Sequence, residues 1–179
     1  MSIKSLSLAL IAIVAITVSS RAQAQHPAMP AGMTHEKHLA QMQKDAEMKT
    51  RGAAAMGFDQ NTTTHHFRLT ATGGAIEVSA NAADDTAGRD AIRAHLQEIA
   101  AEFAKGNFEK PFMTHAEVPP GVDVMKQSAG RIRYAFVKTA GGGVVRIETD
   151  DAAARAAVHA FLRYQITEHA TGDPLTVQR

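Results

Sequence analysis

Two stretches of the chain alternate apolar and polar residues on either side of adjacent glycines. The first, FRLTATGGAIEVSAN, covers residues 67–81, and the second, AFVKTAGGGVVRIETD, covers residues 135–150. Alternation with a period of two is typical of a half-buried strand, and a glycine turn between two such runs predicts a β-hairpin. Each stretch is therefore expected to form two antiparallel strands.

A helical pattern follows each hairpin. Residues 91–107, AIRAHLQEIAAEFAKGN, align without a gap on residues 157–173, AVHAFLRYQITEHATGD, with six identities in seventeen positions. Each segment has an apolar stripe at helical spacing and reaches a glycine suited to the left-handed position after a helix. We interpret the chain as a duplicated β-β-α unit, with residues 108–130 as the connection between the copies.

These hairpins and helices predict the fold class. A four-stranded antiparallel sheet with both helices on one face is the simplest arrangement that buries every apolar face. The expected fold is therefore α+β, with residues 58–179 as the duplicated domain. Strand alternation places these residues beneath the helices: Phe67, Leu69, Ile76, Val78, Ile132, Tyr134, Phe136, Val145 and Ile147.

The first 24 residues have the pattern of a secretory signal peptide. A cationic start at Lys4 precedes an apolar run over residues 6–18 and the motif Ala22-Gln23-Ala24. A membrane anchor is the alternative, but this run is shorter than the roughly 20 residues that span a bilayer. We expect cleavage after Ala24, no membrane span in the mature chain, and a periplasmic or secreted location in a bacterium.

The amino-acid composition limits the kinds of site and partner that the chain can have. The chain has no cysteine, which excludes disulfides, thiolate zinc sites, iron–sulfur clusters and covalently attached c-type haem. The formal net charge is +1 and no basic stripe with interleaved aromatic residues is present, so nucleic acid is not an expected partner. A bound metal ion must be held by His, Met, Asp or Glu.

Residues 25–57 are rich in methionine and histidine and have almost none of the β-branched and aromatic residues that a core requires. Thr34 is the expected N-cap of a helix that reaches about Arg51 and ends at Gly52. This segment is therefore predicted to be a partly helical N-terminal arm.

The arm is the first candidate metal site. His35, His38 and Met42 share one helical face, with Met29 and Met33 just upstream. Thioethers select Cu(I), and imidazoles bind either oxidation state of copper. The alternatives are a methionine-rich segment that binds nothing and a helix that packs its methionines on the domain.

Four histidines of the domain form the second candidate metal site: His65, His95, His115 and His169. Neutral imidazoles suit copper, zinc or nickel. The adjacent His65 and His66 point to opposite faces of a strand, so they cannot chelate one ion as a pair. The alternative is that these histidines only fill space at the margin of the core.

The sheet face turned away from the helices is predicted to be charged. It is a candidate surface for an anionic ligand or for a homodimer, and a simply solvated face is the alternative. Its members are His66, Arg68, Glu77, Arg133, Arg146 and Glu148.

The motifs MGFDQNTTTHHF and HAFLRYQITEHATGD, together with GGAIEVSAN and HAEVPPGVDVM, resemble an uncharacterised family of small exported bacterial proteins. The resemblance covers about residues 56–174. It implies an exported protein with one domain, and it brings no catalytic residue, substrate or cofactor.

No local motif indicates an enzyme. HEKH at residues 35–38 is one residue too short for H-E-x-x-H, and neither a G-x-S-x-G elbow nor a phosphate loop is present. The favoured function is non-catalytic metal binding, of copper first and zinc second. The alternatives are a binding module that uses the charged sheet face and a metal-dependent hydrolase centred on His65, His95 and His169.

Overall fold

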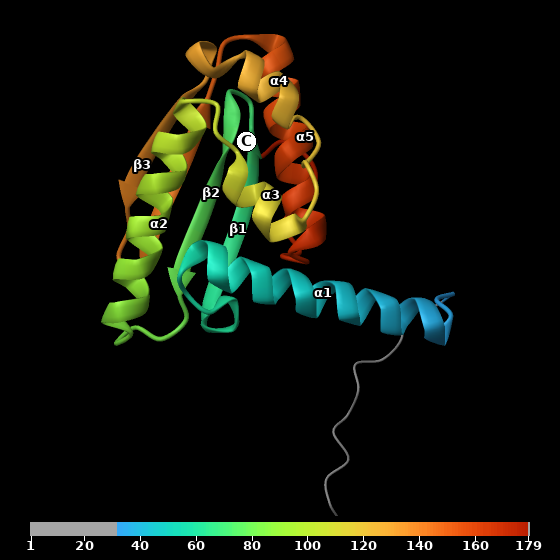
Figure 1. The fold of residues 1–179 in the computed structure, drawn as a ribbon. Coiled ribbons are helices and arrows are strands. Elements are labelled where there is room, and N and C mark those ends of the chain that lie inside the picture. The colour runs from blue at the N-terminus through green and yellow to red at the C-terminus, as the bar shows by residue number, and fades with distance from the viewer. Residues whose placement is uncertain (1–31, 179) are drawn as a thin grey trace, which may run out of the picture. The chain divides into compact units, whose positions relative to one another are not determined.

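The structure is a computed structural model that describes residues 32–178 (Figure 1). The predicted signal peptide over residues 1–24 and the candidate ligand Met29 lie outside the described residues. One compact unit begins at Thr34 and contains every helix and strand named below. No helix in this part of the chain is both long and apolar enough to cross a membrane.

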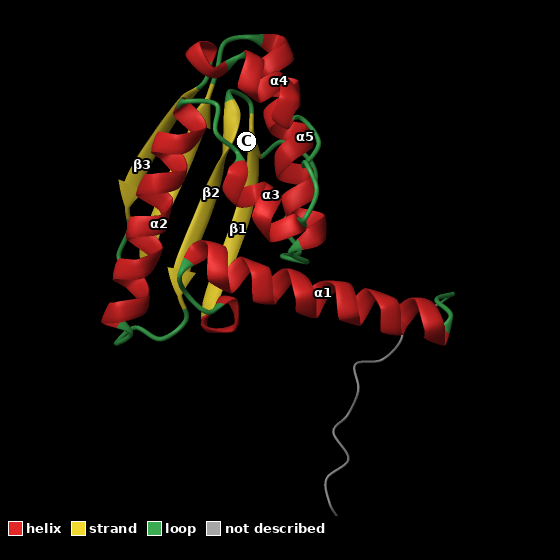
Figure 2. Ribbon diagram, in the orientation of Figure 1, coloured by secondary structure: helices red, strands yellow, loops and turns green. Residues whose placement is uncertain are grey.

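Four antiparallel strands form one sheet (Figure 2). The first hairpin consists of β1 (Thr63–Thr70) and β2 (Gly73–Ala80), and the second consists of β3 (Arg133–Lys138) and β4 (Gly142–Glu148). The strand order is β1-β2-β4-β3, so β2 and β4 pair in the centre while β1 and β3 are the edges. The predicted α+β class with a four-stranded antiparallel sheet is confirmed.

A long helix follows each hairpin. α2 (Thr86–Ala104) begins at the N-cap Asp85 and α5 (Ala152–Glu168) begins at the N-cap Asp151. Each N-cap carboxylate accepts hydrogen bonds from backbone N–H groups of the first turn, which would otherwise lack partners. α2 packs on β3 and β4, and α5 packs on β1 and β2. The duplication of a β-β-α unit stays a prediction.

The connection between the two hairpin–helix units has structure of its own. It contains the helices α3 (Glu109–His115) and α4 (Val122–Gln127) and the 3-10 turn η2 (Ala129–Arg131). Helices of seven and six residues are too short to show a helical period in the sequence, so residues 108–130 read only as a connection.

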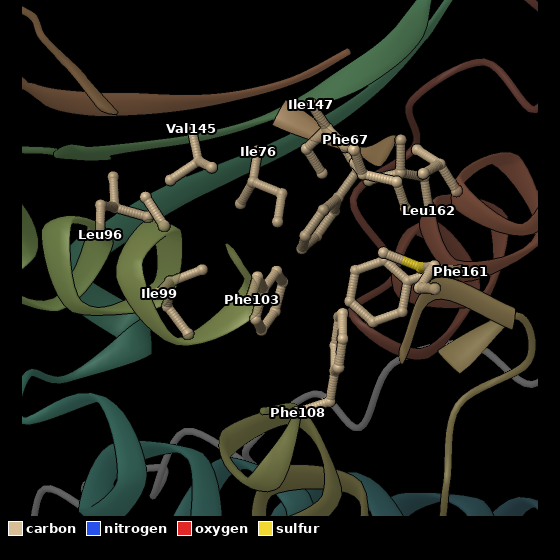
Figure 3. Close-up of a cluster of buried hydrophobic side chains, with 14 of the residues drawn as sticks. Phe67, Ile76, Leu96, Ile99, Phe103, Phe108, Val145, Ile147, Phe161 and Leu162 are labelled. Atoms are coloured by element: carbon tan, nitrogen blue, oxygen red, sulfur yellow. The ribbon is translucent and has the colours of Figure 1, made fainter. Parts of the chain in front are cut away.

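The hydrophobic core lies where α2 and α5 meet the sheet (Figure 3). Phe103 of α2 stacks on Phe108 with ring centroids 4.3 Å apart, and it meets Phe161 of α5 edge to face at 5.9 Å. Tyr134 and Phe136 of β3 are only partly buried. The other strand residues predicted beneath the helices are buried: Phe67, Leu69, Ile76, Val78, Ile132, Val145 and Ile147.

The first helix, α1 (His35–Met56), begins as predicted but is longer. The Thr34 side chain accepts a hydrogen bond from the Lys37 N–H, which confirms Thr34 as the N-cap. The predicted end at Gly52 is wrong: α1 continues to Met56 and is closed by Gly57, whose φ of 78° is left-handed. Gly52 instead permits a close approach, since a Cβ there would lie 2.0 Å from Nε2 of Gln60, whose segment includes the turn η1 (Gln60–Thr62).

α1 packs against the rest of the compact unit. Met48 is 4% exposed, and the Arg51 Nε donates a hydrogen bond to the backbone oxygen of Thr114 in α3 at 3.1 Å. Lys44 forms an ion pair with Glu168 at the end of α5 at 2.8 Å. The sequence divides the chain at residue 57, whereas the compact unit begins at Thr34 and includes α1.

Replacing Met48 with Ala is expected to lower the free energy of unfolding by about 2–5 kcal/mol, because it leaves a cavity under α1. Met42→Ala is the matched control, since Met42 is 39% exposed on the same helix, and it should change the unfolding free energy by no more than about 0.5 kcal/mol. Urea unfolding followed by far-UV circular dichroism measures both. Equal, small effects would contradict the packing of α1 on the domain.

Candidate functional site

Four histidines from four elements line one cavity of about 60 Å³. A single water needs roughly 10–15 Å³ by this measure, so the cavity has room for a small ligand or an ion. Phe67, Phe103 and Phe161 form part of its apolar wall and are seen in Figure 3. The histidines are those of the second candidate site: His65 of β1, His95 of α2, His115 of α3 and His169 after α5.

Local sequence explains how two of these histidines reach the cavity. Alternation along β1 turns His65 toward the cavity, while His66 lies on the other face and its Nδ1 is 2.9 Å from an oxygen of Asp173. His95 lies three residues after Ile92 and four before Ile99, both buried, so it shares the inward face of α2.

The other two histidines lie at helix ends. His115 is the last residue of α3 and His169 is the C-cap of α5, and the residues after them, Ala116 and Ala170, have φ values of 57° and 49°. Among the described residues these are the only non-glycine residues with positive φ. A left-handed conformation costs a residue with a Cβ about 1–2 kcal/mol, and backbone strain of this kind is concentrated at functional sites.

The rings lie close to one another. His169 is central: its ring centroid is 5.9 Å from that of His65, with the rings nearly parallel at 9°, and 5.1 Å from that of His115, with the rings at 85°. Phe58 joins the fourth histidine to this group, because its centroid is 6.0 Å from that of His65 and 5.6 Å from that of His95. Three imidazoles are therefore in direct ring contact and Phe58 links the fourth to them; we call the four histidines the histidine cluster.

Several polar atoms of the cluster are buried without a hydrogen-bond partner. The His115 Nε2 lies 3.0 Å from the amide oxygen of Gln165, which can only accept, so Nε2 carries the proton and Nδ1 keeps a free lone pair. In the described part of the chain no partner is present for His115 Nδ1, His65 Nε2, His95 Nδ1 or the Gln165 amide nitrogen. Buried polar groups are normally paired, so these atoms mark a site that can accept a ligand.

Burial keeps the cluster uncharged at neutral pH. Desolvation lowers the pKa of His65 and His95 from 6.5 to about 4 and that of His169 to about 3, and it also lowers the pKa of His115. The neighbouring His115 and His65 add to this effect for His169, since a second positive charge nearby is unfavourable. Each ring therefore keeps one unprotonated nitrogen at pH 7.

Charged residues near the cavity are already paired. Lys110 of α3 lines the cavity, forms an ion pair with Glu98 at 3.1 Å and donates a hydrogen bond to the backbone oxygen of Ala55 at 3.2 Å. Among the described residues, no aspartate or glutamate lines the cavity. The site is therefore formed by neutral donors in an apolar wall, with one neutralised lysine.

The candidate residues of the arm do not join the cluster. His35 and Met42 are exposed on α1, His38 is half-buried there, and Met33 directly precedes the N-cap. α1 reaches the cavity only through its last residue, Met56.

Sequence reasoning did not identify Met56, Phe58, Lys110 or Gln165 as part of the site. Gln165 could have been identified from the sequence, since it is a polar residue within the buried and otherwise apolar stripe of α5.

The charged sheet face carries its own ion pairs. Arg68 pairs with Glu77 at 3.1 Å, and Arg133 contacts Glu148. Arg146 is exposed in the centre of the sheet, between Ala75 and Ala135 in the strand register. This arrangement leaves one arginine of the face without an ion pair among the described residues.

No group of three or more His, Asp or Glu side chains within residues 32–178 has the geometry to hold a metal ion. Comparisons of the chain with protein-family profiles, with curated proteins and with solved structures found no match.

Acid is expected to destabilise the protein between pH 6.5 and about pH 4. In this window the histidines of the unfolded chain take up protons while those of the cluster do not, so falling pH favours the unfolded state. A single histidine with a pKa of about 4 lowers the unfolding free energy at pH 5 by roughly 2 kcal/mol relative to pH 7.5. Urea unfolding at pH 7.5, 6 and 5 measures the loss.

Matched variants separate the cluster from other titrating groups. His65→Phe should reduce the loss of stability between pH 7.5 and pH 5, whereas His35→Gln, at an exposed position, should leave it unchanged. A loss that is the same in the wild type and His65→Phe would show that the cluster is not the acid-sensitive element.

Proposed function

We propose that this protein binds a transition-metal ion, copper or zinc, through the histidine cluster, and that it does not catalyse a reaction. The observation that carries the proposal is the convergence of four imidazoles from β1, α2, α3 and the end of α5 on one cavity. Imidazole nitrogen is a common ligand for both metals.

The spacing of the rings supports this proposal. Two imidazoles on one tetrahedral ion, with nitrogen about 2.0–2.1 Å from the metal, have ring centroids roughly 5 Å apart. The His115–His169 separation is 5.1 Å and the His65–His169 separation is 5.9 Å. Because the His65 and His169 rings are nearly parallel, their nitrogens can meet on one ion only after the side chains rotate.

The surroundings of His115 also support the metal-binding proposal. A metal-ligating histidine usually donates its second ring N–H to an oxygen, which fixes the tautomer and the ring orientation. Gln165 accepts such a bond from His115 Nε2 and leaves Nδ1 available toward the cavity. His115 and His169 each directly precede a left-handed residue, Ala116 and Ala170, at the end of a helix.

A hydrolase is less well supported than a binding protein. Metal-dependent hydrolysis usually employs a carboxylate as general base beside the ligands, and the lining of the cavity contains none among the described residues. The small volume also leaves little space for a substrate next to the ion. The proposed place of action is the periplasm or the exterior of a bacterium, as the predicted signal peptide implies.

The metal-binding proposal is tested by titrating the purified protein with Zn(II), and with Cu(I) under anaerobic conditions, in competition with chromophoric chelators. His169→Ala is expected to weaken binding by at least about 100-fold, because His169 lies between two other rings of the cluster. The double variant His35→Ala/His38→Ala should bind as the wild type does.

Three results would contradict this proposal. They are the absence of binding by the wild type, loss of affinity in the arm variant, and full affinity in His169→Ala. His66→Ala, on the opposite face of β1, controls for a change of fold near the strand.

A second candidate function is recognition of an anion or of a second copy through the charged sheet face. The exposed Arg146, flanked by two alanines and without an ion pair in the described part of the chain, is the observation in its favour. Arg146→Glu should then abolish a homodimer seen by sedimentation, while the unfolding free energy stays within about 0.5 kcal/mol of the wild type. An unchanged sedimentation coefficient would remove the dimer from this candidate.

A further inference from the structure

Met56 brings a different kind of donor to the histidine cluster. It is the last residue of α1, it is partly buried, and it lines the same cavity as the four histidines. Its terminal methyl group lies 3.1 Å from the position that a Cβ on Gly52 would occupy, one helical turn earlier. The end of the Met56 side chain therefore lies against Gly52, which has no side chain to displace it.

Two of the buried nitrogens around this cavity belong to side chains that are more than nine-tenths buried. His95 is 8% exposed and His115 is 6% exposed, and Nδ1 of each lacks a partner in the described part of the chain. A ligand that accepts a lone pair satisfies the His115 Nδ1, and it satisfies the His95 Nδ1 in the tautomer that is protonated at Nε2. A metal cation is such a ligand.

The charge of the surroundings favours a monovalent ion. The cost of burying an ion in an apolar medium rises with the square of its charge, so a +1 ion costs about a quarter as much as a +2 ion of the same size. No carboxylate in the described lining offsets that cost, and the one lysine there is neutralised by Glu98. The next carboxylates outward are also engaged, since Glu168 pairs with Lys44 and Glu117 accepts a hydrogen bond from Tyr164.

The types of ligand atom around the cavity also favour a monovalent ion. Zinc sites are formed by Cys, His and carboxylate ligands, whereas thioethers are soft donors that favour Cu(I). In a chain without cysteine, methionine is the only soft ligand that is available. A cavity with four neutral imidazoles and one thioether therefore fits Cu(I) better than Zn(II) or Cu(II).

We infer that the ion held by the histidine cluster is Cu(I) and that Met56 is one of its ligands. This inference rests on the metal site proposed above and deepens it, because it names the ion and its oxidation state. It also gives α1 a role at the site that differs from the arm positions His35, His38 and Met42.

The test compares Met56→Leu with Met48→Leu. Both replace a methionine of α1 by a residue of similar volume, which a packed site tolerates well, but Met48 does not line the cavity. Cu(I) affinity is measured anaerobically by competition with bicinchoninate, and Zn(II) affinity by competition with a chromophoric zinc chelator. Far-UV circular dichroism verifies the fold of both variants.

Met56→Leu is expected to weaken Cu(I) binding by about 10- to 100-fold and to leave Zn(II) binding within about twofold. Met48→Leu should alter neither. X-ray absorption of the Cu(I)-loaded wild type should show a sulfur neighbour that is lost in Met56→Leu.

Unchanged Cu(I) affinity in Met56→Leu, or a copper spectrum without sulfur, would overturn this inference. A wild type that binds Zn(II) more tightly than Cu(I) would also overturn it, while the broader metal-binding proposal would stand. A wild type that binds neither ion would remove both.

Discussion

The removal of water from four imidazoles determines both the chemistry of the cavity and the sensitivity of the fold to acid. The same packing of helices on the sheet that buries Phe103 and Phe161 also encloses the histidine cluster. In that environment the charged form of histidine is disfavoured, so the rings stay neutral at pH values where a solvated histidine would begin to take up protons. A core that excludes water thereby also prepares nitrogen lone pairs for a ligand, at the cost of stability in acid.

The cavity exists because segments that are far apart in the sequence meet there. β1 and α2 belong to the first hairpin–helix unit, α5 to the second, and α3 to the connection between them. α1 packs on α3 through the Arg51–Thr114 hydrogen bond and brings Met56 to the cavity. The Met/His-rich segment, which has no core of its own, thus contributes to the site through its packed end, while His35 and Met42 remain exposed.

Regular patterns made most of the fold predictable. Period-two alternation identified both hairpins, and helical spacing identified α2 and α5, because each of these elements presents a repeating apolar face. The Thr34 N-cap could also be predicted, since its hydrogen bond joins residues that are close in the sequence. The extension of α1 beyond Gly52 was not, because a glycine near the end of a helical pattern is also suited to end the helix. α3 and α4 are too short to show a period.

The candidate site was predictable only in part. Residue chemistry and strand alternation selected His65, His95, His115 and His169, but their meeting around one cavity follows from tertiary packing that no linear spacing contains. The partners of the cluster were missed for the same reason: Gln165 is recognisable as the acceptor for His115 only once α3 and α5 are side by side.

The most direct test of the central claim is NMR of the ring nitrogens in protein labelled with ¹⁵N-histidine, recorded at pH 7 before and after addition of Cu(I). The account predicts neutral-ring signals for the histidine cluster, with its ligating members shifting together upon metal addition, while His35, His38 and His66 stay in place. Shifts confined to the arm histidines, or protonated rings in the cluster at pH 7, would contradict it.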